Sequence, residues 1–277
     1  MKIALTGGSG GIGRAVTQLA LAQGHSVVSI DRVTPAPEVA HSDLTFRQLD
    51  LADYSTLEQA LRGCEALIHL GAIPSPGDDP DHIVHNNNVV GSYNTLRAAV
   101  EVGITRITQA SSVNAVGLAY SRSPRYDYFP LDEQHPTYNE DPYSLSKWIC
   151  EQQGDSFARR YENLTIASLR FHWVVPDREY ARQHGRRQEQ YPGFSKSLWG
   201  YVRADATSRA CLLGLTANLT GHEAFCIVAP DTCVDEPSLA LAQRYYPAVH
   251  IRGDLSGTRG FFDCSKAERL LGWKHDP

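Results

Sequence analysis

Residues 141–148, DPYSLSKW, place a tyrosine and a lysine four positions apart, Tyr143 and Lys147. On a helix, positions i and i+4 share one face, so the phenol and the ammonium would be neighbours. A nearby positive charge stabilises phenolate and lowers the pKa of a tyrosine from its ordinary value of about 10. Such a phenol can take a proton from an alcohol or give one to a carbonyl. The alternative interpretation is an ordinary surface pair on a helix.

A glycine motif stands at the start of the chain. The apolar segment KIALT (2–6) runs into TGGSGGIG (6–13), where Gly7, Gly10 and Gly13 precede an amphipathic segment. Glycines in this position allow a tight turn, close approach of the main chain to a pyrophosphate and close packing of helix on strand. Because the motif follows a strand and opens a helix, it predicts a dinucleotide site rather than a simple turn.

A carboxylate ends the next expected strand. Asp31 closes HSVVSID (25–31) and is followed by Arg32. A carboxylate here accepts hydrogen bonds from ribose hydroxyls and repels the 2′-phosphate of NADP, whereas Arg32 or Arg14 could accommodate that phosphate. We therefore expect NAD, with NADP as the alternative. Asp50 and Leu51 follow the third expected strand and are placed to meet the adenine ring.

The elements that must position these residues alternate along the chain. The expected strands are 2–6, 25–31, 45–50, 65–71, 104–112 and 164–171, and the expected helices are 11–24, 55–63, 82–103 and 144–162. Apolar strands bounded by glycines, with helices between them, predict an α/β fold with a Rossmann-type, doubly wound parallel sheet. Right-handed crossovers then place the carboxyl ends of the strands, and any ligand, along one edge.

The alternation weakens after residue 172. We expect a short strand and a helix in 199–217, a strand in 223–229, and helices in 238–246 and 265–272. These pieces are too small to form an independent core. The expected organisation is a cofactor-binding domain over 1–172 and a small substrate-binding region over 173–277 packed on it. The segment 199–217 is a candidate to complete the layout of the cofactor domain.

Composition limits the partners and the compartment. The 277 residues carry a formal net charge of -5, which argues against a nucleic acid or an anionic membrane as partner. The basic stretch 178–187 includes Glu179 and is expected to be a solvated loop or helix face. The opening segment is too short for a signal peptide, and no apolar run is long enough to span a membrane.

Cysteine and histidine usage points to a reducing compartment and to no metal. The six cysteines form no C-x-x-C pair and lie in apolar segments, so we expect free thiols and a cytoplasmic location. His82 and His85 have the spacing H-x-x-H, but no third ligand is evident, so no metal site is expected.

Taken together, the motifs resemble the extended branch of the short-chain dehydrogenase/reductase superfamily, the NAD-dependent epimerase/dehydratase family. The resemblance covers residues 1 to about 215. The motifs that carry it occur in order: TGGSGGIG (6–13), HLGA (69–72), NVVGSYN (88–94), SSVNAVG (111–117) and YSLSK (143–147). Two later segments, YVRADATSRA (201–210) and LLGWK (270–274), are also similar to parts of the family.

The resemblance implies the roles of individual residues. It implies catalysis by Ser112, Tyr143 and Lys147, with Asn88 holding the central helix and a nearby water. Ser112 would polarise the oxygen that exchanges a proton with Tyr143, and Lys147 would also hold the nicotinamide ribose. The expected cofactor contacts are Gly7, Gly10, Gly11, Ile12, Gly13, Asp31, Arg32, Asp50, Leu51, Leu70, Gly71, Ala72, Asn88, Tyr143, Lys147 and Phe171. The expected substrate contacts are Pro74, Ser75, Val113, Asn114, His172 and Trp173.

The chain departs from the family's pattern near the substrate. Val116 stands where a tyrosine is common, and the long connection 120–141 is either a surface loop or part of the substrate wall. His172 and Trp173 replace polar groups that nucleotide-sugar members use, and the C-terminal part is short for gripping a diphosphonucleotide. We therefore expect a small substrate without a nucleotide. The size and layout are similar to uronate dehydrogenases, although Val113 and Asn114 differ from their serine segment.

The sequence leaves several functions open. The favoured one is an NAD(P)-dependent oxidoreductase acting on a secondary alcohol or carbonyl of a small molecule. The first alternative is an NAD-dependent epimerase or dehydratase of a sugar or sugar derivative, including uronate dehydrogenase-like activity. The others are a regulatory protein that binds the cofactor without turnover and a cofactor-independent cyclase or isomerase. The resemblance also implies a homodimer formed through the helices 82–103 and 144–162.

Overall fold

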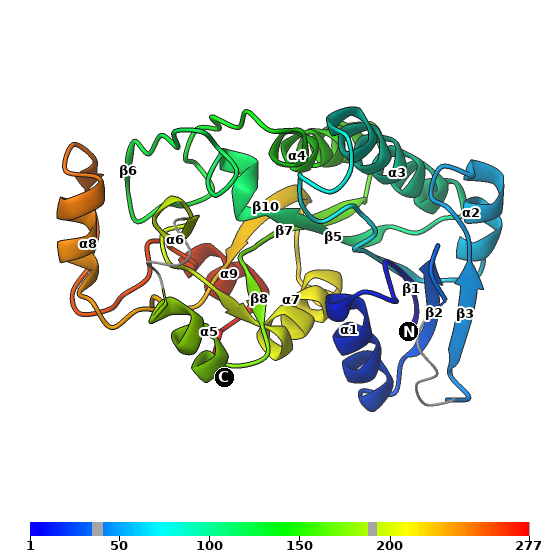
Figure 1. Ribbon diagram of the computed structural model, residues 1–277. Coiled ribbons are helices and arrows are strands. Elements are labelled where there is room, and N and C mark those ends of the chain that lie inside the picture. The colour runs from blue at the N-terminus through cyan, green and yellow to red at the C-terminus, as the bar shows by residue number, and fades with distance from the viewer. Residues whose placement is uncertain (35–40, 188–192, 277) are drawn as a thin grey trace.

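A seven-stranded parallel sheet forms the centre of the computed structural model, which describes residues 1–34, 41–187 and 193–276 (Figure 1). The strand order is β10-β7-β5-β4-β1-β2-β3. The strands are β1 (Lys2–Thr6), β2 (Ser26–Asp31), β3 (Leu44–Gln48), β4 (Ala66–His69), β5 (Arg106–Ser112), β7 (Thr165–Phe171) and β10 (Gly221–Ile227). The doubly wound α/β fold expected from the sequence is confirmed.

Helices cover both faces of this sheet. One face carries α1 (Gly11–Ala22), α7 (Ala204–Thr216) and α9 (Ser265–Leu271). The other carries α2 (Tyr54–Leu61), α3 (Asp81–Glu101) and α4 (Pro142–Arg160), with α3 and α4 packed side by side (Figure 1). The start of α4 is well defined, because the Asp141 side chain accepts a hydrogen bond from the main-chain nitrogen of Ser144 at 2.9 Å and Pro142 follows it. Tyr143 and Lys147 therefore lie in its first two turns.

The strand pairing brings the expected motifs to one edge. β1 pairs with β2 on one side and with β4 on the other. The strand order therefore runs outward from β1 in both directions. In such sheets, ligands bind outside the carboxyl ends of the strands, where the order reverses. The glycine loop after β1, Asp31 at the end of β2 and Leu70 after β4 all lie at this point.

The expected domain boundary at residue 172 falls between two neighbouring strands of the central sheet, β7 and β10. β10 lies beyond that boundary, yet it pairs with β7 in parallel register from Gly221 to Ile227. Helix α7 packs on α1 and on the sheet, as the sequence suggested for 199–217. Sequence patterning missed the membership of β10 because an edge strand of this kind is specified by its neighbours in space.

A smaller region completes the side of the molecule away from β3 (Figure 1). Its elements are β6 (Tyr128–Phe129), β8 (Val174–Val175), β9 (Val202–Arg203), β11 (His250–Ile251), α5 (Arg178–Gly185), α6 (Gly193–Lys196) and α8 (Ser238–Tyr245). β6 pairs with β11, and β8 pairs with β9. Phe129, Trp199, Tyr201 and Phe261 are fully buried in its core. The connection 120–141 therefore contributes to this core and is more than a surface loop.

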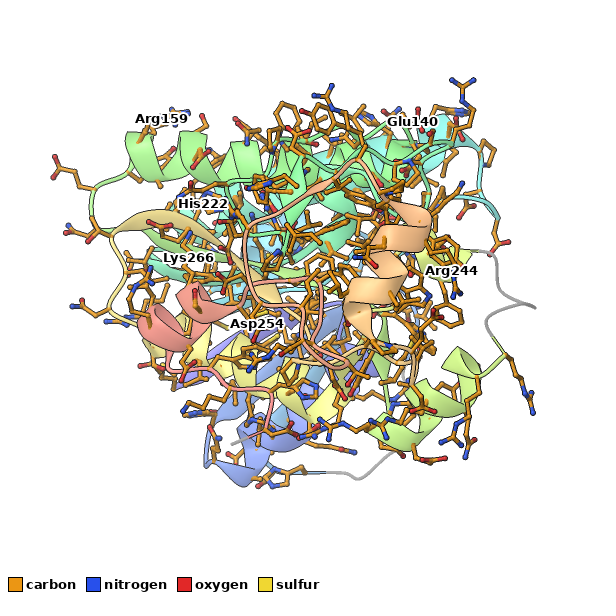
Figure 2. All side chains as sticks on the ribbon, turned by 90° about the vertical axis from the view of Figure 1, so that its left-hand side faces the viewer. Glu140, Arg159, His222, Arg244, Asp254 and Lys266 are labelled. Carbon is orange, nitrogen blue, oxygen red and sulfur yellow. The ribbon has the colours of Figure 1, made fainter. Side chains whose placement is uncertain are left out.

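β10 is one of the two edge strands of the sheet, and side chains from two helices contact it (Figure 2). Lys266 on α9 donates to the main-chain oxygen of Ala224 at 2.8 Å, which satisfies an edge carbonyl. On the other face, His222 lies 2.8 Å from an oxygen of Asp155 and 2.7 Å from the hydroxyl of Ser168. This Ser–His–Asp arrangement is structural, since Ser168 has 0% exposure and also accepts from Gln109 at 2.7 Å.

Two kinds of feature, a membrane-spanning helix and a metal-binding cluster, are absent from the described residues. None of the helices in 1–34, 41–187 and 193–276 is long and apolar enough to cross a membrane. The same part of the chain holds no group of three or more His, Cys, Asp or Glu side chains arranged to bind a metal ion. All six cysteines are free thiols, and five of them are buried.

Candidate active site

The glycine loop has the geometry that a dinucleotide phosphate requires. Gly7 has a φ of +72°, which favours glycine, and a Cβ on Gly13 would lie 2.2 Å from the main-chain oxygen of Gly7. Helix α1 starts after Gly10 with no side chain capping its end and no acidic residue in its first turn. Its N-terminal amides and positive dipole end are therefore available to an anion. The residues present fit the pyrophosphate of NAD.

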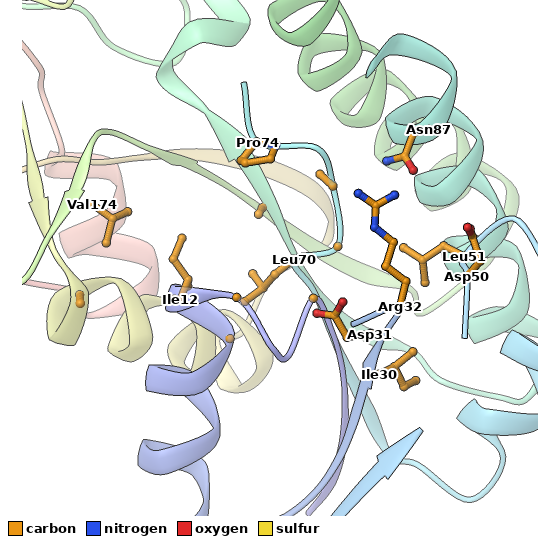
Figure 3. Close-up of a pocket in the computed structure, with 18 of the residues that line it drawn as sticks. Ile12, Ile30, Asp31, Arg32, Asp50, Leu51, Leu70, Pro74, Asn87 and Val174 are labelled. Atoms are coloured by element: carbon orange, nitrogen blue, oxygen red, sulfur yellow. The ribbon is translucent and has the colours of Figure 1, made fainter. Parts of the chain in front are cut away.

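A cavity of about 620 Å³ extends from this loop along the ends of the strands (Figure 3). Asp31 accepts hydrogen bonds from the main-chain nitrogens of Ser9 at 3.0 Å and Val33 at 3.1 Å. Its carboxylate thus also ties the glycine loop to the end of β2. Arg32 extends across the cavity toward Asn87 of α3, above Leu51 (Figure 3). A carboxylate and a cation therefore lie side by side at this end of the cavity, where the sequence predicts the adenosine ribose.

The three expected catalytic side chains meet at the carboxyl end of β5. Ser112 is the last residue of β5, and its hydroxyl accepts from the main-chain nitrogen of Asn114 at 3.1 Å. The ammonium of Lys147 donates to the main-chain oxygen of Ala110 at 2.9 Å and lies 5.9 Å from the centre of the Tyr143 ring. All three side chains are nearly inaccessible to solvent in the fold, and all three line one cavity.

The protonation state of Tyr143 differs from the sequence-based expectation. Burial raises its pKa well above the ordinary value, although the hydrogen bond with the Ser112 hydroxyl opposes this shift. Burial also lowers the pKa of Lys147. The ammonium interacts with a main-chain oxygen rather than with the phenol, so the expected lowering is not found. The protonated phenol is the form that gives a proton to a carbonyl.

Asn88 supports the site without lining it. Its side chain accepts from the main-chain nitrogen of Ile73 at 2.8 Å and donates to the oxygen of Ile73 and to the hydroxyl of Ser146, each at 3.0 Å. These bonds join α3, α4 and the loop after β4, beside the catalytic pair. Asn88 has 2% exposure and is not among the described residues that line either cavity, and its bonds hold the elements that carry the catalytic pair.

A buried ion pair lies behind the catalytic residues. Glu151, one turn after Lys147, pairs with Arg170 of β7 at 2.8 Å and accepts from the Ser111 hydroxyl. Arg170 keeps a strongly raised pKa because of this partner, despite its burial. The pair connects α4 to the carboxyl ends of β5 and β7. Sequence reasoning missed it because Glu151 and Arg170 carry no motif of their own.

A second cavity, of about 860 Å³, opens in front of Tyr143. It shares its lining residues Ile12, Leu70 and Pro74 with the first cavity, so the two are continuous. The Nε2 atom of His172 lies 2.8 Å from the main-chain oxygen of Ser197, and its Nδ1 accepts from the nitrogen of Trp173 at 2.7 Å. Burial lowers the pKa of His172 to about 4, although the hydrogen bond with the Ser197 oxygen opposes this shift, so the ring is neutral at pH 7.

Most residues expected at the site do line these two cavities. The exceptions are Ser75 and Asn88, which line neither. Asn87, the neighbour of Asn88, lines the first cavity instead. Lining residues that sequence reasoning missed are Ile30, Leu49, Ala110, Ser111, Ala119, Tyr120, Val174, Val175, Pro176, His184, Gly193, Phe194, Ser197, Gly200 and Ala204. Val174 to Pro176 come shortly after β7, a strand that the sequence predicts. Their position near the carboxyl end of that strand is the only sequence signal that could have identified them.

A family model for the NAD-dependent epimerase/dehydratase family matches residues 3–198. The chain belongs to this family. The match covers more than half of the chain and includes the glycine loop, Ser112 and the Tyr143–Lys147 pair. The chain is thus an enzyme of a family named for its use of NAD.

Two relatives of known activity are NAD(P)-dependent dehydrogenases. L-arabinose 1-dehydrogenase (NAD(P)(+)) of Haloferax volcanii is 30% identical over 205 residues, which cover 72% of this chain and 76% of that protein. dTDP-6-deoxy-L-talose 4-dehydrogenase (NAD(+)) of Aggregatibacter actinomycetemcomitans is 31% identical over 183 residues, 64% of this chain and 63% of that protein.

Solved structures show the same fold. UDP-glucose 4-epimerase from Bifidobacterium longum, in complex with NAD+ and UDP, has a TM-score of 0.74 at 18% identity and covers 100% of this chain and 94% of that one. A mutated uronate dehydrogenase has a TM-score of 0.68 at 19% identity, with coverage of 100% and 82%. At this identity the likeness concerns the fold alone.

Proposed function

We propose that the protein is an NAD-dependent oxidoreductase that interconverts a secondary alcohol and a carbonyl on a small substrate without a nucleotide. The observation that carries this proposal is the meeting of Ser112, Tyr143 and Lys147 at the point where the cofactor cavity opens into the second cavity. When bound, the nicotinamide supplies or accepts the hydride. The chain's own residues must handle the proton.

In this proposal Tyr143 exchanges the proton with the substrate oxygen, and Ser112 donates a hydrogen bond to the same oxygen. The ammonium of Lys147 donates a hydrogen bond to the main-chain oxygen of Ala110 on β5 at 2.9 Å. Its positive charge disfavours the binding of a further proton by neighbouring side chains. In the reduction direction, the protonated Tyr143 already has the form of a general acid. In the oxidation direction, Tyr143 must first lose its proton, so this direction gains from a higher pH.

The preference for NAD over NADP rests on Asp31. Its carboxylate faces the adenosine end of the cavity and would accept hydrogen bonds from the ribose hydroxyls (Figure 3). The same charge repels a 2′-phosphate. Arg32 beside it explains why NADP is a weaker second cofactor rather than an excluded one.

The test is calorimetric titration of the protein and of two variants with NAD and NADP. Tyr143→Phe should bind NAD as the wild type does but lose turnover by about 10²–10⁴-fold, because only the proton transfer is removed. Asp31→Ala should bind NAD more weakly, and the difference in affinity between NAD and NADP should become smaller. Failure to bind either cofactor would overturn the proposal and favour a cofactor-independent isomerase.

Net formation of NADH from an alcohol separates the oxidoreductase from its alternatives. An epimerase or dehydratase of a sugar would oxidise its substrate transiently and release no NADH. A regulatory protein would bind NAD without turning over any alcohol, and Tyr143→Phe would then change nothing that can be measured. The retained Ser–Tyr–Lys set argues against this last alternative.

We also propose a homodimer formed through α3 and α4. Ile83, Val90 and Tyr93 on one face of α3 and Leu145 on α4 are large apolar side chains that are 36–46% exposed. A second copy would cover this face with the same face of its own helices. Val90→Lys should convert a dimer to a monomer in sedimentation experiments, whereas Leu239→Lys, on α8, should not.

A cytoplasmic location is proposed from the thiols. All six cysteines are free, and burial raises the pKa of Cys211, Cys226 and Cys264, which keeps these thiols unreactive. Free buried thiols are usual where the surroundings are reducing. Fractionation of the native host with an antibody against the protein would test this location.

A further inference from the structure

The chemistry of the cavity in front of Tyr143 narrows the substrate class, and this inference rests on the proposed function. The described lining contains no arginine, aspartate or glutamate. Its single ammonium belongs to Lys147, which is already bonded to the oxygen of Ala110. A phosphate or carboxylate held away from water needs a charged partner or several N–H donors. The lining also includes His184, whose Nδ1 lies 2.9 Å from the main-chain oxygen of Tyr180. Among the described lining residues, an anionic substrate therefore finds no carboxylate-binding arginine and no lysine other than Lys147.

Basic side chains on the elements around the cavity have partners elsewhere. Arg178 and Arg182 on α5 both form ion pairs with Asp231, at 3.5 Å and 3.7 Å. Lys196 on α6 donates to main-chain oxygens of residues 121 and 122, at 2.9 Å and 3.1 Å. Between α5 and α6, Arg186 pairs with Asp235 at 3.5 Å, and Arg187 is exposed and is not among the described residues that line the cavity. These groups therefore do not supply the missing cation.

The wall of the cavity opposite the sheet is aromatic. The Trp173 ring contacts Phe194 of α6 at 5.8 Å between ring centres and His184 of α5 at 5.7 Å. On the side of α4, Tyr120 stands edge-on to Tyr143 with ring centres 5.7 Å apart. Rings arranged in this way offer faces and edges to another planar ring. The cavity therefore suits a flat, apolar body.

Hydrogen-bonding capacity is concentrated at the reacting end. Both ring nitrogens of His172 are taken by the main chain, so this histidine offers the substrate no polar atom. Asn114 uses its side-chain oxygen to accept from the nitrogen of Ala119 at 2.9 Å. The hydroxyls of Ser112 and Tyr143 remain for the substrate oxygen, and the hydroxyl of Tyr120 belongs to the same end of the cavity, where its ring contacts Tyr143. A sugar, with polar groups around its ring, would leave most of them unpaired.

We propose that the substrate is an uncharged ketone, or the corresponding secondary alcohol, with an aromatic body that packs against Trp173. In the reduction direction the carbonyl carbon gains a hydride from NADH and the carbonyl oxygen gains the proton of Tyr143, which leaves the alcohol and NAD. Trp173 sets the specificity in this proposal, and the absent cation excludes sugar acids and nucleotide sugars.

The test compares two ketones that differ only in charge, acetophenone and 4-acetylbenzoate, with NADH as reductant. We expect kcat/KM to be about 100-fold or more higher for acetophenone, because the carboxylate would lose its water without gaining a partner. Calorimetric binding of the two alcohol products to the NAD complex should show the same order. Trp173→Ala should weaken acetophenone binding while NAD binding stays unchanged.

Gly193 offers a matched pair of variants that reverses this preference. It lines the cavity, and a Cβ added to it meets none of the described residues within 4 Å, so the described part of the chain leaves room for a side chain. Gly193→Arg adds a guanidinium at the wall and should raise kcat/KM for 4-acetylbenzoate about tenfold. Gly193→Gln, of similar length without charge, should not.

The outcomes separate this inference from the proposed function. Equal or better use of 4-acetylbenzoate by the wild type, or binding of NAD without binding of either aromatic probe, would overturn the aromatic, uncharged substrate and leave the oxidoreductase standing. Failure to bind NAD at all would overturn the proposed function and this inference together.

Discussion

The neutral state of His172 makes the stability of the fold depend on pH in a way that one substitution can isolate. Its Nδ1 accepts from the main-chain nitrogen of Trp173 at 2.7 Å, and its Nε2 lies 2.8 Å from the oxygen of Ser197. A second ring proton would face an N–H group and find no acceptor. Burial lowers the pKa of His172 from 6.5 to about 4.

The sign of the effect follows from where each state binds the proton. Below pH 6.5 the unfolded chain takes up a proton at this histidine, and the folded protein does so only near pH 4. The free energy of unfolding is therefore unaffected above this window and falls as the pH falls through it. At pH 5 the loss is about 2 kcal/mol. Burial lowers the pKa of His69 to about 3, which adds a further loss of about 2 kcal/mol at pH 5.

The assay is urea unfolding at pH 7 and pH 5 of the wild type, His172→Asn and His82→Asn. The His172 variant should lose about 2 kcal/mol less than the wild type between the two pH values, whatever its stability at pH 7, because asparagine does not titrate. His82 is exposed on α3, so its replacement should leave the pH dependence as in the wild type. Equal losses in the wild type and His172→Asn, or an NMR titration of the His172 ring near pH 6.5, would refute the reasoning.

Three further predictions concern the loop, the buried ion pair and the proton donor. Gly13→Ala should weaken NAD binding more than tenfold in calorimetry, because the added Cβ would lie 2.2 Å from the main-chain oxygen of Gly7. Glu151→Gln should lower the free energy of unfolding, measured in urea, by about 3–5 kcal/mol, because it leaves the buried guanidinium of Arg170 without its charged partner. The control Glu58→Gln breaks a surface pair with Arg62 and should change the free energy of unfolding by less than about 1 kcal/mol. Because burial raises the pKa of Tyr143, stopped-flow rates of hydride transfer should rise with pH for alcohol oxidation and stay flat over neutral pH for carbonyl reduction.

Local patterning was enough to predict the nucleotide half of the site. The glycines of residues 6–13 and the pair Tyr143 and Lys147 act through spacing along a single turn or helix, so their geometry follows from the chain itself. Asp31 is likewise placed by ending its strand. The helices and strands that carry these residues begin and end close to where apolar periodicity, glycines and the Asp141–Pro142 start signal put them.

The substrate half depended on contacts between distant segments. Phe194 meets Trp173 across two loops, and His172 becomes a structural group only because Ser197 supplies its second partner. No short-range pattern encodes such pairings, since each arises when separate elements pack at one edge of the sheet. The assignment of β10 to the central sheet has the same origin.

By itself, the sequence determined the fold class and the glycine motif, and it predicted which residues would exchange the proton, because each of these rests on local spacing and on hydrophobic period. Only the tertiary structure decided the electrostatics. The raised pKa of Tyr143, the neutrality of His172 and the absence of arginine from the described lining of the second cavity come from burial and from the packing of distant segments. These quantities belong to the packed molecule, where water is excluded and each polar group must find its partner in space.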